Sequence, residues 1–111
     1  MLSFLKKLFG IGSSPSSLQT DIDFKKMFDE GAVIIDVRTV KEFDAGHIDG
    51  ALNFPVQTIE QHIEEIRALN KPVIAHCRSG ARSGRATKIL NHHGIKTVNG
   101  GAFKVLKEIL K

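Results

Sequence analysis

The chain has 111 residues, of which 41% are hydrophobic, and its formal net charge is +4. This length fits one domain, and the sequence has no apolar run of the roughly 18 residues that a membrane-spanning helix needs. The single cysteine excludes an internal disulfide and is typical of a reducing compartment, so we expect a cytoplasmic protein. We also expect a monomer.

The charge differs between the two parts of the chain. Residues 1–65 hold six Lys/Arg and eleven Asp/Glu, whereas residues 66–111 hold ten Lys/Arg and one Asp/Glu. The basic part predicts either a positive field that attracts small anions or lysines that lie on solvated helix faces. No aromatic residues interleave with the basic ones and no nucleic-acid motif occurs, so we expect no nucleic-acid binding.

Residues 1–16 are predicted to form a separate amphipathic tail and linker. Residues 1–12 are apolar with two lysines, and a helix would place four large apolar side chains on one face. Two interpretations remain open: weak contact of residues 1–12 with a membrane surface, or a loosely docked or disordered segment. Lysines interrupt the apolar stretch and no A-x-A site follows it, so a cleaved signal peptide is not expected.

The remaining residues, 17–111, are predicted to form one domain of alternating helices and strands. Thr20 is the expected N-cap of a first helix, which ends at Gly31. The run at residues 33–37, Val-Ile-Ile-Asp-Val, is apolar on both faces and is therefore typical of a central parallel strand.

Two capping boxes predict the next two helices. Thr39 and Glu42 open a short helix, which is followed by a strand at residues 51–54. Thr58 and Gln61 open a second helix. Its buried stripe is expected to consist of Ile59, Ile63 and Ile66.

The rest of the pattern is a strand at residues 72–75, a helix that ends at Gly94, a short strand at 97–98 and a helix at 102–110. This alternation predicts an α/β fold with an open, mostly parallel sheet and helices on both faces. In such folds, ligands bind beyond the C-terminal ends of the strands.

Cys77 follows the strand predicted at residues 72–75 and begins the loop that leads into the next helix. Backbone N–H groups at such a position point into the loop, and the helix N-terminus adds positive potential. Arg78 and Arg82 lie in the same segment. These features favour the thiolate, so the sequence predicts a nucleophile beside an anion-binding loop.

The substrate-binding residues are expected to be the five that follow the cysteine: Arg78, Ser79, Gly80, Ala81 and Arg82. Gly80 permits the tight turn that brings N–H groups to the sulfur. Arg82 either contacts the anion or buttresses the loop, whereas Arg78 either binds the anion or points to solvent. A lone cysteine is often only a small buried hydrophobic residue, but the cationic, glycine-containing turn argues against that interpretation.

The polar residues around the loop are expected to be structural. An Arg38–Glu42 ion pair is predicted to steady the corner near the site. His76 precedes the nucleophile and should point away from the pocket, and His47 should satisfy hydrogen bonds in a turn. The pair His92–His93 with one distant cysteine does not match a zinc pattern, so we expect no metal.

Several short segments occur in a fixed order: VIIDVR at residues 33–38, EF at 42–43, GHIDGALNFP at 46–55, CRSGARS at 77–83 and NGG at 99–101. In this order they resemble the rhodanese-like domain family, over about residue 17 to the end. Phe103 stands where that family often has tryptophan, which predicts a change in packing and not in chemistry.

The resemblance implies a single-domain sulfurtransferase. In this interpretation Cys77 takes sulfane sulfur from a small anionic donor such as thiosulfate and forms a persulfide. The sulfur then passes to cyanide or to a thiol acceptor. No cofactor is implied, because the cysteine itself carries the sulfur.

Two other functions remain open. Cysteine-dependent phosphatases and arsenate reductases also attack an anion held in a loop, but with five residues between Cys and Arg; only four separate Cys77 from Arg82. No aspartate stands nearby in sequence as a general acid. The second alternative is a non-catalytic binding module with the same fold, which loss of the cysteine would mark.

Overall fold

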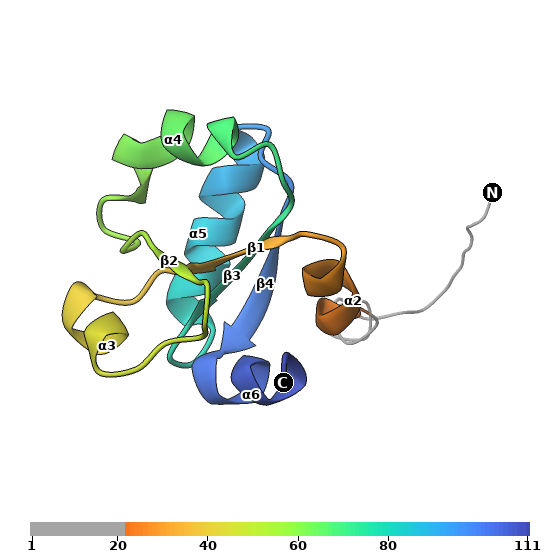
Figure 1. The fold of residues 1–111 in the computed structure, drawn as a ribbon. Helices are drawn as coiled ribbons and strands as arrows, with labels where there is room; N and C mark the ends of the chain where they lie inside the picture. Colours follow the sequence, from red (N-terminus) through yellow and green to blue (C-terminus); the bar gives the residue numbers. More distant parts are fainter. Residues whose placement is uncertain (1–21) are drawn as a thin grey trace, which may run out of the picture.

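The most apolar runs of the sequence form the centre of a four-stranded, all-parallel sheet (Figure 1). The computed structural model describes residues 22–111, and the predicted tail of residues 1–16 lies outside them. The strand order is β2-β1-β3-β4. The strands are β1 Val33–Asp36, β2 Leu52–Asn53, β3 Val73–Cys77 and β4 Thr97–Ala102.

Helices cover both faces of this sheet, which confirms the predicted fold class. The α-helices are α2 Phe24–Asp29, α3 Val40–Asp44, α4 Ile63–Ala68, α5 Ala81–His92 and α6 Phe103–Ile109, and a 3₁₀ turn, η1 Ile59–His62, precedes α4. Helices α4 and α5 lie on one face, and α2 and α6 lie on the other (Figure 1). No helix within residues 22–111 is long and apolar enough to cross a bilayer.

The alternation of side chains along β1 and β3 creates two separate cores. Ile35 and Ala75 pack with α4 and α5, whereas Ile34 and Ile74 pack with α2 and α6. All four side chains are at most 2% exposed. Burial of a large aliphatic side chain stabilises a fold by roughly 1.5–3 kcal/mol, so both faces contribute to a rigid sheet.

Two of the predicted helix starts are wrong. Asp23 is the N-cap of α2 and its side chain accepts a hydrogen bond from the Lys26 N–H; Thr20 lies outside the described residues. At the second capping box, the Thr58 hydroxyl makes no cap and lies 3.5 Å from the Pro55 carbonyl oxygen, because the chain there begins with a 3₁₀ turn.

Other predicted details of the helices are confirmed. The capping box of α3 is complete, with Thr39 and Glu42 each bonded to the other's backbone N–H. The stripe before β3 is buried, and its members are Ile59, Ile63 and Ile66.

Strand β4 is longer than predicted, and Gly100 interrupts its pairing with β3. Ala75 pairs with Asn99 and His76 pairs with Gly101, so Gly100 is the extra residue of a bulge. A Cβ atom on Gly100 would lie 2.7 Å from Ile74 Cγ2 and 3.0 Å from a Leu106 methyl carbon. Only glycine fits there, and the bulge leaves the Asn99 side chain facing α5.

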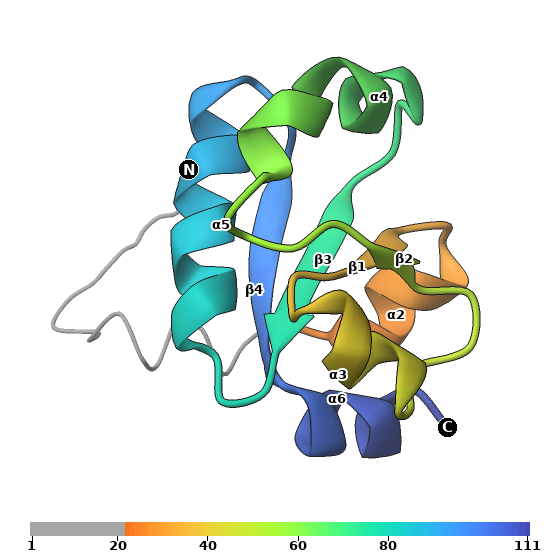
Figure 2. The same cartoon turned by 90° about the vertical axis from the view of Figure 1, so that its left-hand side faces the viewer.

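The C-terminal ends of the central strands lie at one end of the molecule. Figure 2 shows the loop after β3, the start of α5 and helix α3 at this end, close to α6. Cys77 is the last residue of β3 and Asp36 the last residue of β1. The parallel topology therefore brings the two polar strand ends together.

Candidate active site

The loop between β3 and α5 is a tight turn of three residues, Arg78–Gly80. Gly80 is the N-cap of α5 and has φ +104, a left-handed conformation that residues with a Cβ atom rarely adopt. It contributes no side-chain cap, so no N-cap side chain occupies the first N–H groups of the helix. The predicted role of Gly80 in shaping this turn agrees with its backbone.

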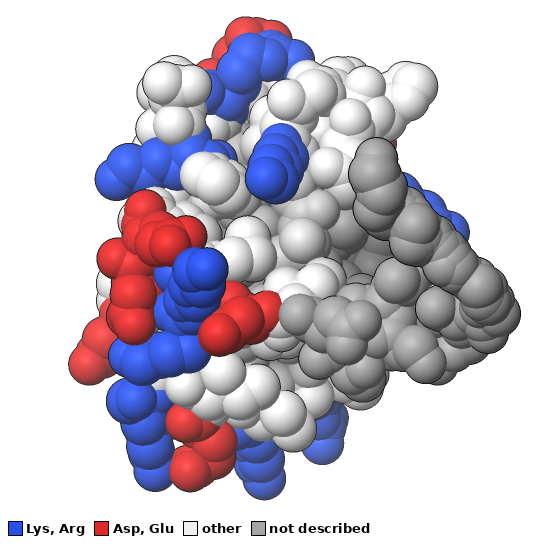
Figure 3. Space-filling model, turned by 90° about the vertical axis from the view of Figure 1, so that its right-hand side faces the viewer, with Lys and Arg blue, Asp and Glu red and all other residues white. Residues whose placement is uncertain are grey.

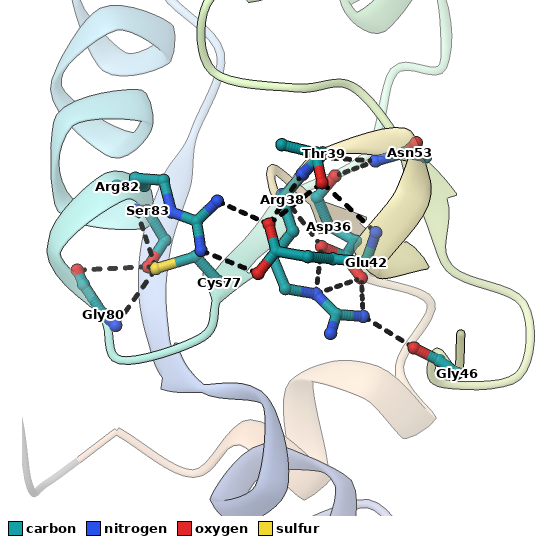
Figure 4. A network of polar contacts seen from close by, with 10 residues as sticks. All are labelled: Asp36, Arg38, Thr39, Glu42, Gly46, Asn53, Cys77, Gly80, Arg82 and Ser83. Carbon is teal, nitrogen blue, oxygen red and sulfur yellow. Dashed lines mark hydrogen bonds and ion pairs between the residues drawn. The ribbon is translucent and has the colours of Figure 1, made fainter. Parts of the chain in front are cut away.

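The Cys77 sulfur lies inside this turn and accepts hydrogen bonds from it (Figure 4). Gly80 N–H donates to Sγ over 3.0 Å and Ser83 N–H donates over 3.3 Å. The Ser83 hydroxyl oxygen lies 3.4 Å from the same atom. Cys77 is 1% exposed, so these donors replace water around the sulfur.

Burial and hydrogen bonding act on the Cys77 pKa in opposite directions. Burial raises the pKa of the thiol, because a thiolate is poorly solvated there. Hydrogen bonds from the Ser83 hydroxyl and N–H, and from the N–H groups of Gly80 and Ser79, lower it by more. The net pKa is below the ordinary value of a cysteine, as expected for a nucleophile.

Arg82 does not point at the sulfur, because Glu42 of α3 holds its guanidinium (Figure 4). Nη1 and Nη2 donate to the two carboxylate oxygens over 2.7 and 3.1 Å. The Arg82 hydrogen bond is the main reason that the pKa of Glu42 falls to about 2. Of the two roles predicted for Arg82, the geometry favours the buttress; direct contact with an anion stays a prediction.

The predicted Arg38–Glu42 ion pair is wrong, because Asp36 binds Arg38 instead. Arg38 Nη2 donates to Asp36 Oδ2 over 2.6 Å and Nε donates to Oδ1 over 2.9 Å. Arg38 Nη2 also donates to the Gly46 carbonyl oxygen over 2.8 Å. Asp36 is fully buried at the end of β1, so its carboxylate needs a partner more than the partly exposed Glu42 does.

The remaining residues of the loop lie at its rim. Arg78, Ser79 and Ala81 are exposed, and Arg78 forms no ion pair within residues 22–111. Their predicted role in substrate binding stays a prediction. Figure 3 shows another face, where acidic and basic side chains mix along one margin, so the basic charge of residues 66–111 forms no single patch there.

The two histidines near the site have the structural positions that were expected. His76 lies on the opposite face of the sheet from Cys77, fully buried, with its ring stacked on Phe103 at a centroid distance of 5.8 Å. Burial lowers the pKa of His76, which favours the neutral ring. His47 Nδ1 lies 2.9 Å from the Phe43 carbonyl oxygen in the turn after α3.

Ser83 and Asn99 are the polar residues of the site to which the sequence analysis gave no role. Ser83 Oγ lies 2.7 Å from Asn99 Oδ1, and Asn99 Nδ2 donates to the Gly80 carbonyl oxygen over 3.1 Å. A serine in the first turn of a helix that follows a catalytic loop is a usable signal for Ser83. Asn99 is 16 residues further on, and only the fold brings it to the loop.

A cavity of about 510 Å³ opens beside the loop. Its lining includes two exposed cations, Arg78 and Lys104, and the ring of Phe103. The Arg38 guanidinium, which is paired with the buried Asp36, lies 4.2 Å from the centre of that ring. Among residues 22–111, no three His, Cys, Asp or Glu side chains lie close enough together to hold a metal ion.

Comparison with known proteins agrees with this architecture. The model of the rhodanese-like domain matches residues 20–108. The uncharacterized protein YqhL of Bacillus subtilis is 43% identical over 75 residues, which are 66% of this chain and 59% of that protein. Thiosulfate sulfurtransferase PspE of Escherichia coli is 33% identical over 72 residues, which are 63% of this chain and 69% of that protein.

Solved structures and longer relatives share the same domain. The human single-domain sulfurtransferase TSTD1 superposes with a TM-score of 0.62 at 28% identity, over 77% of this chain and 89% of that chain. A tRNA uridine(34) hydroxylase of Buchnera aphidicola is 30% identical over 71% of this chain, which spans only 28% of that protein. The family match over residues 20–108 and the shared fold show that the chain belongs to the rhodanese-like domain family.

Proposed function

We propose that this protein is a sulfurtransferase that carries sulfane sulfur on Cys77, from a small anionic donor such as thiosulfate to cyanide or a thiol acceptor. One observation carries the proposal: the Cys77 sulfur accepts hydrogen bonds from the backbone N–H groups of Gly80 and Ser83, at the N-terminus of α5. Such donors stabilise the thiolate and leave its sulfur free to attack a substrate.

In the first step the Cys77 thiolate attacks the outer sulfur of thiosulfate. A sulfur–sulfur bond forms to Cys77, the bond between the sulfane sulfur and the sulfonate breaks, and sulfite leaves with the electron pair. The product is a persulfide whose terminal sulfur carries the negative charge. The N-terminus of the 12-residue helix α5 supplies positive potential to that charge.

In the second step the acceptor attacks the terminal sulfur. Cyanide becomes thiocyanate, or a thiolate becomes a new persulfide, and the bond to Cys77 breaks with its electrons returning to Sγ. The hydrogen bonds from Gly80 and Ser83 then stabilise the leaving thiolate. No redox partner or cofactor is required by this balance.

The cavity beside the loop supports an anionic substrate. Arg78 and Lys104 line it and form no ion pair within the described part of the chain, whereas the Glu42 carboxylate, which also lines it, is paired with Arg82. The charges of Arg78 and Lys104 are therefore available to a ligand. Its volume of about 510 Å³ is within the range of sites for small organic molecules. We therefore infer that donor and acceptor reach Cys77 along this side of the loop.

A phosphatase reaction is less well supported. It needs a general acid for the leaving group. Glu42 is the carboxyl group nearest to the loop through its pair with Arg82, but a pKa of about 2 keeps it ionised at neutral pH. Asp36 is fully buried and bound by Arg38. The loop also remains one residue shorter than the phosphatase spacing, as the sequence indicates.

The two other possibilities lack an observation of their own. A purely non-catalytic module would not need a cysteine surrounded by hydrogen-bond donors at the loop. The relation to the tRNA uridine(34) hydroxylase concerns a shared domain that makes up a minor part of that protein, and no group in residues 22–111 favours hydroxylation over sulfur transfer.

Intact-mass spectrometry after incubation with thiosulfate tests the proposal. We expect the mass of one added sulfur atom, located on Cys77, and its removal by cyanide with release of thiocyanate. The Cys77→Ser variant serves as the control and should gain no mass. Hydrolysis of p-nitrophenyl phosphate by the native protein, without a sulfur adduct, would instead support the phosphatase alternative.

A further inference from the structure

The hydroxyl proton of Ser83, in the first turn of α5, has three acceptors within reach. The Ser83 Oγ atom lies 2.7 Å from Asn99 Oδ1, 3.2 Å from the Gly80 carbonyl oxygen and 3.4 Å from Cys77 Sγ. A serine hydroxyl carries a single proton, so it makes one strong hydrogen bond as a donor at a time. Distance favours the amide oxygen when the sulfur is neutral, whereas charge favours the sulfur when it is a thiolate.

The orientation of the Asn99 amide is fixed by two backbone partners. Gly101 N–H donates to Oδ1 over 2.9 Å, and Nδ2 donates to the Gly80 carbonyl oxygen over 3.1 Å. A half-turn of the amide would set its NH₂ group against the Gly101 N–H and its oxygen against the carbonyl of Gly80. The oxygen of Asn99 therefore faces Ser83.

We propose that Asn99 is a positioning residue whose amide oxygen, the nearest of these acceptors, competes with the sulfur for the Ser83 hydroxyl proton, so that this proton leaves the Cys77 sulfur when the sulfur is neutral and returns when it is charged. The proposal rests on the proposed function, in which Cys77 alternates between a thiolate and a persulfide. Asn99 makes no hydrogen bond to the sulfur among the contacts given above, so in this proposal it affects the sulfur through the Ser83 hydroxyl.

The three forms of the cysteine place the proton differently. In the thiol, S–H donates to Ser83 Oγ while the hydroxyl donates to Asn99. In the thiolate, the hydroxyl rotates and donates to the charged sulfur, and Asn99 Oδ1 keeps its bond from Gly101. In the persulfide the charge lies on the terminal sulfur, so the hydroxyl returns to Asn99. Rotation changes hydrogen bonds only.

It follows that Asn99 competes with the thiolate for the Ser83 proton. Asn99 stabilises the thiol and persulfide forms relative to the thiolate, and it makes Cys77 less acidic than Ser83 alone would. A residue that only held the loop in place would affect the Cys77 pKa in the opposite direction. If Asn99 only held Gly80 in place, its loss would move the N–H donors away from the sulfur and make Cys77 less acidic.

Other charged groups near the loop act on Cys77 from each surrounding element and are left unchanged in the test. They are Arg78 in the loop, Arg82 on α5, Glu42 on α3, Asp36 and Arg38 at the end of β1, His76 on β3 and Lys104 on α6. Their contributions cancel when variants of Asn99 and Ser83 are compared at one ionic strength.

The test is an ultraviolet titration of the Cys77 thiolate in the intact chain. The chain has one Cys, no Trp and no Tyr, so no tyrosinate absorbance overlaps the thiolate signal at high pH. Asn99→Ala should lower the pKa of Cys77 by about half a unit or more, the size expected for release of one competing hydrogen bond. Ser83→Ala should raise it.

The double variant Ser83→Ala/Asn99→Ala isolates the route through the hydroxyl. Without the hydroxyl there is no proton to compete for, so removal of Asn99 should no longer lower the Cys77 pKa. A pKa that rises or stays constant in Asn99→Ala with Ser83 present would overturn the proposal. So would an equal lowering in both backgrounds.

Asn91→Ala is the matched structural control. Asn91 also ties α5 to β4, through hydrogen bonds to the N–H and carbonyl of Thr97, but it does not touch the loop. It should leave the Cys77 pKa unchanged, and a lowering equal to that in Asn99→Ala would overturn the proposal.

A second substitution covers the case in which Asn99→Ala does not fold. Asn99→Asp keeps the shape and attracts the hydroxyl more strongly, so it should raise the Cys77 pKa more with Ser83 present than in the Ser83→Ala background. Equal rises in the two backgrounds would overturn the proposal. The titration uses no sulfur donor, so its outcome is separate from the mass test of sulfur transfer.

Discussion

The C-terminal ends of β1 and β3 lie side by side, but their anionic groups are stabilised in different ways. At the end of β1, the Asp36 carboxylate receives a backbone N–H and two guanidinium nitrogens, all from Arg38. At the end of β3, the Cys77 sulfur accepts hydrogen bonds from two backbone N–H groups and lies near a hydroxyl, and no Lys or Arg side chain within residues 22–111 donates a hydrogen bond to it. Both groups are almost completely buried.

The difference explains why one strand end is structural and the other is suited to chemistry. A guanidinium bound to a carboxylate neutralises its charge and occupies its oxygens, so the carboxylate becomes a poor nucleophile and a poor base. Backbone donors stabilise negative charge while leaving the nucleophile uncovered, and they serve a new charge on an attached sulfur equally well. The cation nearest to this sulfur on α5, Arg82, donates its hydrogen bonds to Glu42 and not to the sulfur.

Cys77→Ser should abolish the chemistry at the end of β3. The serine hydroxyl is far less acidic than a thiol and cannot carry sulfane sulfur, so all sulfur transfer should be lost while the fold is retained. Thiocyanate production from thiosulfate and cyanide measures the activity, and circular dichroism checks the fold. Residual activity in this variant would show that Cys77 is not the sulfur carrier.

Asp36→Ala should remove the ion pair at the end of β1 and lower the free energy of unfolding. It leaves Arg38 buried without its partner, and breaking a buried pair typically destabilises a protein by roughly 3–5 kcal/mol. Urea unfolding of native protein and variant measures the loss. The double variant Asp36→Ala/Arg38→Met should regain part of the stability, because it removes the unpaired charge; a loss below about 1 kcal/mol in the single variant would contradict the structural role of the pair.

Substitution of Arg78 and Arg82 should separate the contribution of the exposed arginine in the loop from that of the arginine bound to Glu42. Arg82→Ala removes the link to α3 and should lower kcat/KM for thiosulfate by roughly tenfold, whereas Arg78→Ala should lower it by about threefold, mostly through KM. Added salt should weaken the Arg78 effect more, because that charge is exposed. Equal and negligible effects would mean that backbone N–H groups alone hold the donor.

The Glu42–Arg82 pair should contribute a small, pH-dependent stability. The pKa of Glu42 is about 2 in the fold, against an ordinary value of 4.5, so the pair stabilises the fold above about pH 4.5. That contribution is lost as pH falls through 2. Both side chains are about 30% exposed, so we expect at most about 1 kcal/mol.

Comparison with Glu42→Gln measures this contribution. The difference in unfolding free energy between native protein and variant should be present at about pH 6 and should shrink steadily below about pH 4. A difference that stays constant across this range would show that ionisation of Glu42 is not what couples α3 to the loop.

The sequence predicted the fold class and the position of Cys77 because both follow from local patterns. Apolar runs specify parallel strands, and glycine after a strand specifies the turn that exposes helix N–H groups. The prediction that Arg38 pairs with Glu42 was wrong because Asp36 and Glu42 are both close to Arg38 in sequence. Only the burial of Asp36 decides between them. Asn99 had no assigned role because the bulge at Gly100, which turns it toward α5, depends on contacts with Ile74 and Leu106.

The most direct test of the account is whether the reactive form of Cys77 is a thiolate held by the loop. Ultraviolet titration should give a pKa below the unperturbed value of about 8.5, and the rate of persulfide formation from thiosulfate should rise with pH at the same midpoint. A titration midpoint at or above about 8.5, or a rate that does not follow the thiolate, would contradict the claim that these hydrogen bonds make Cys77 the nucleophile.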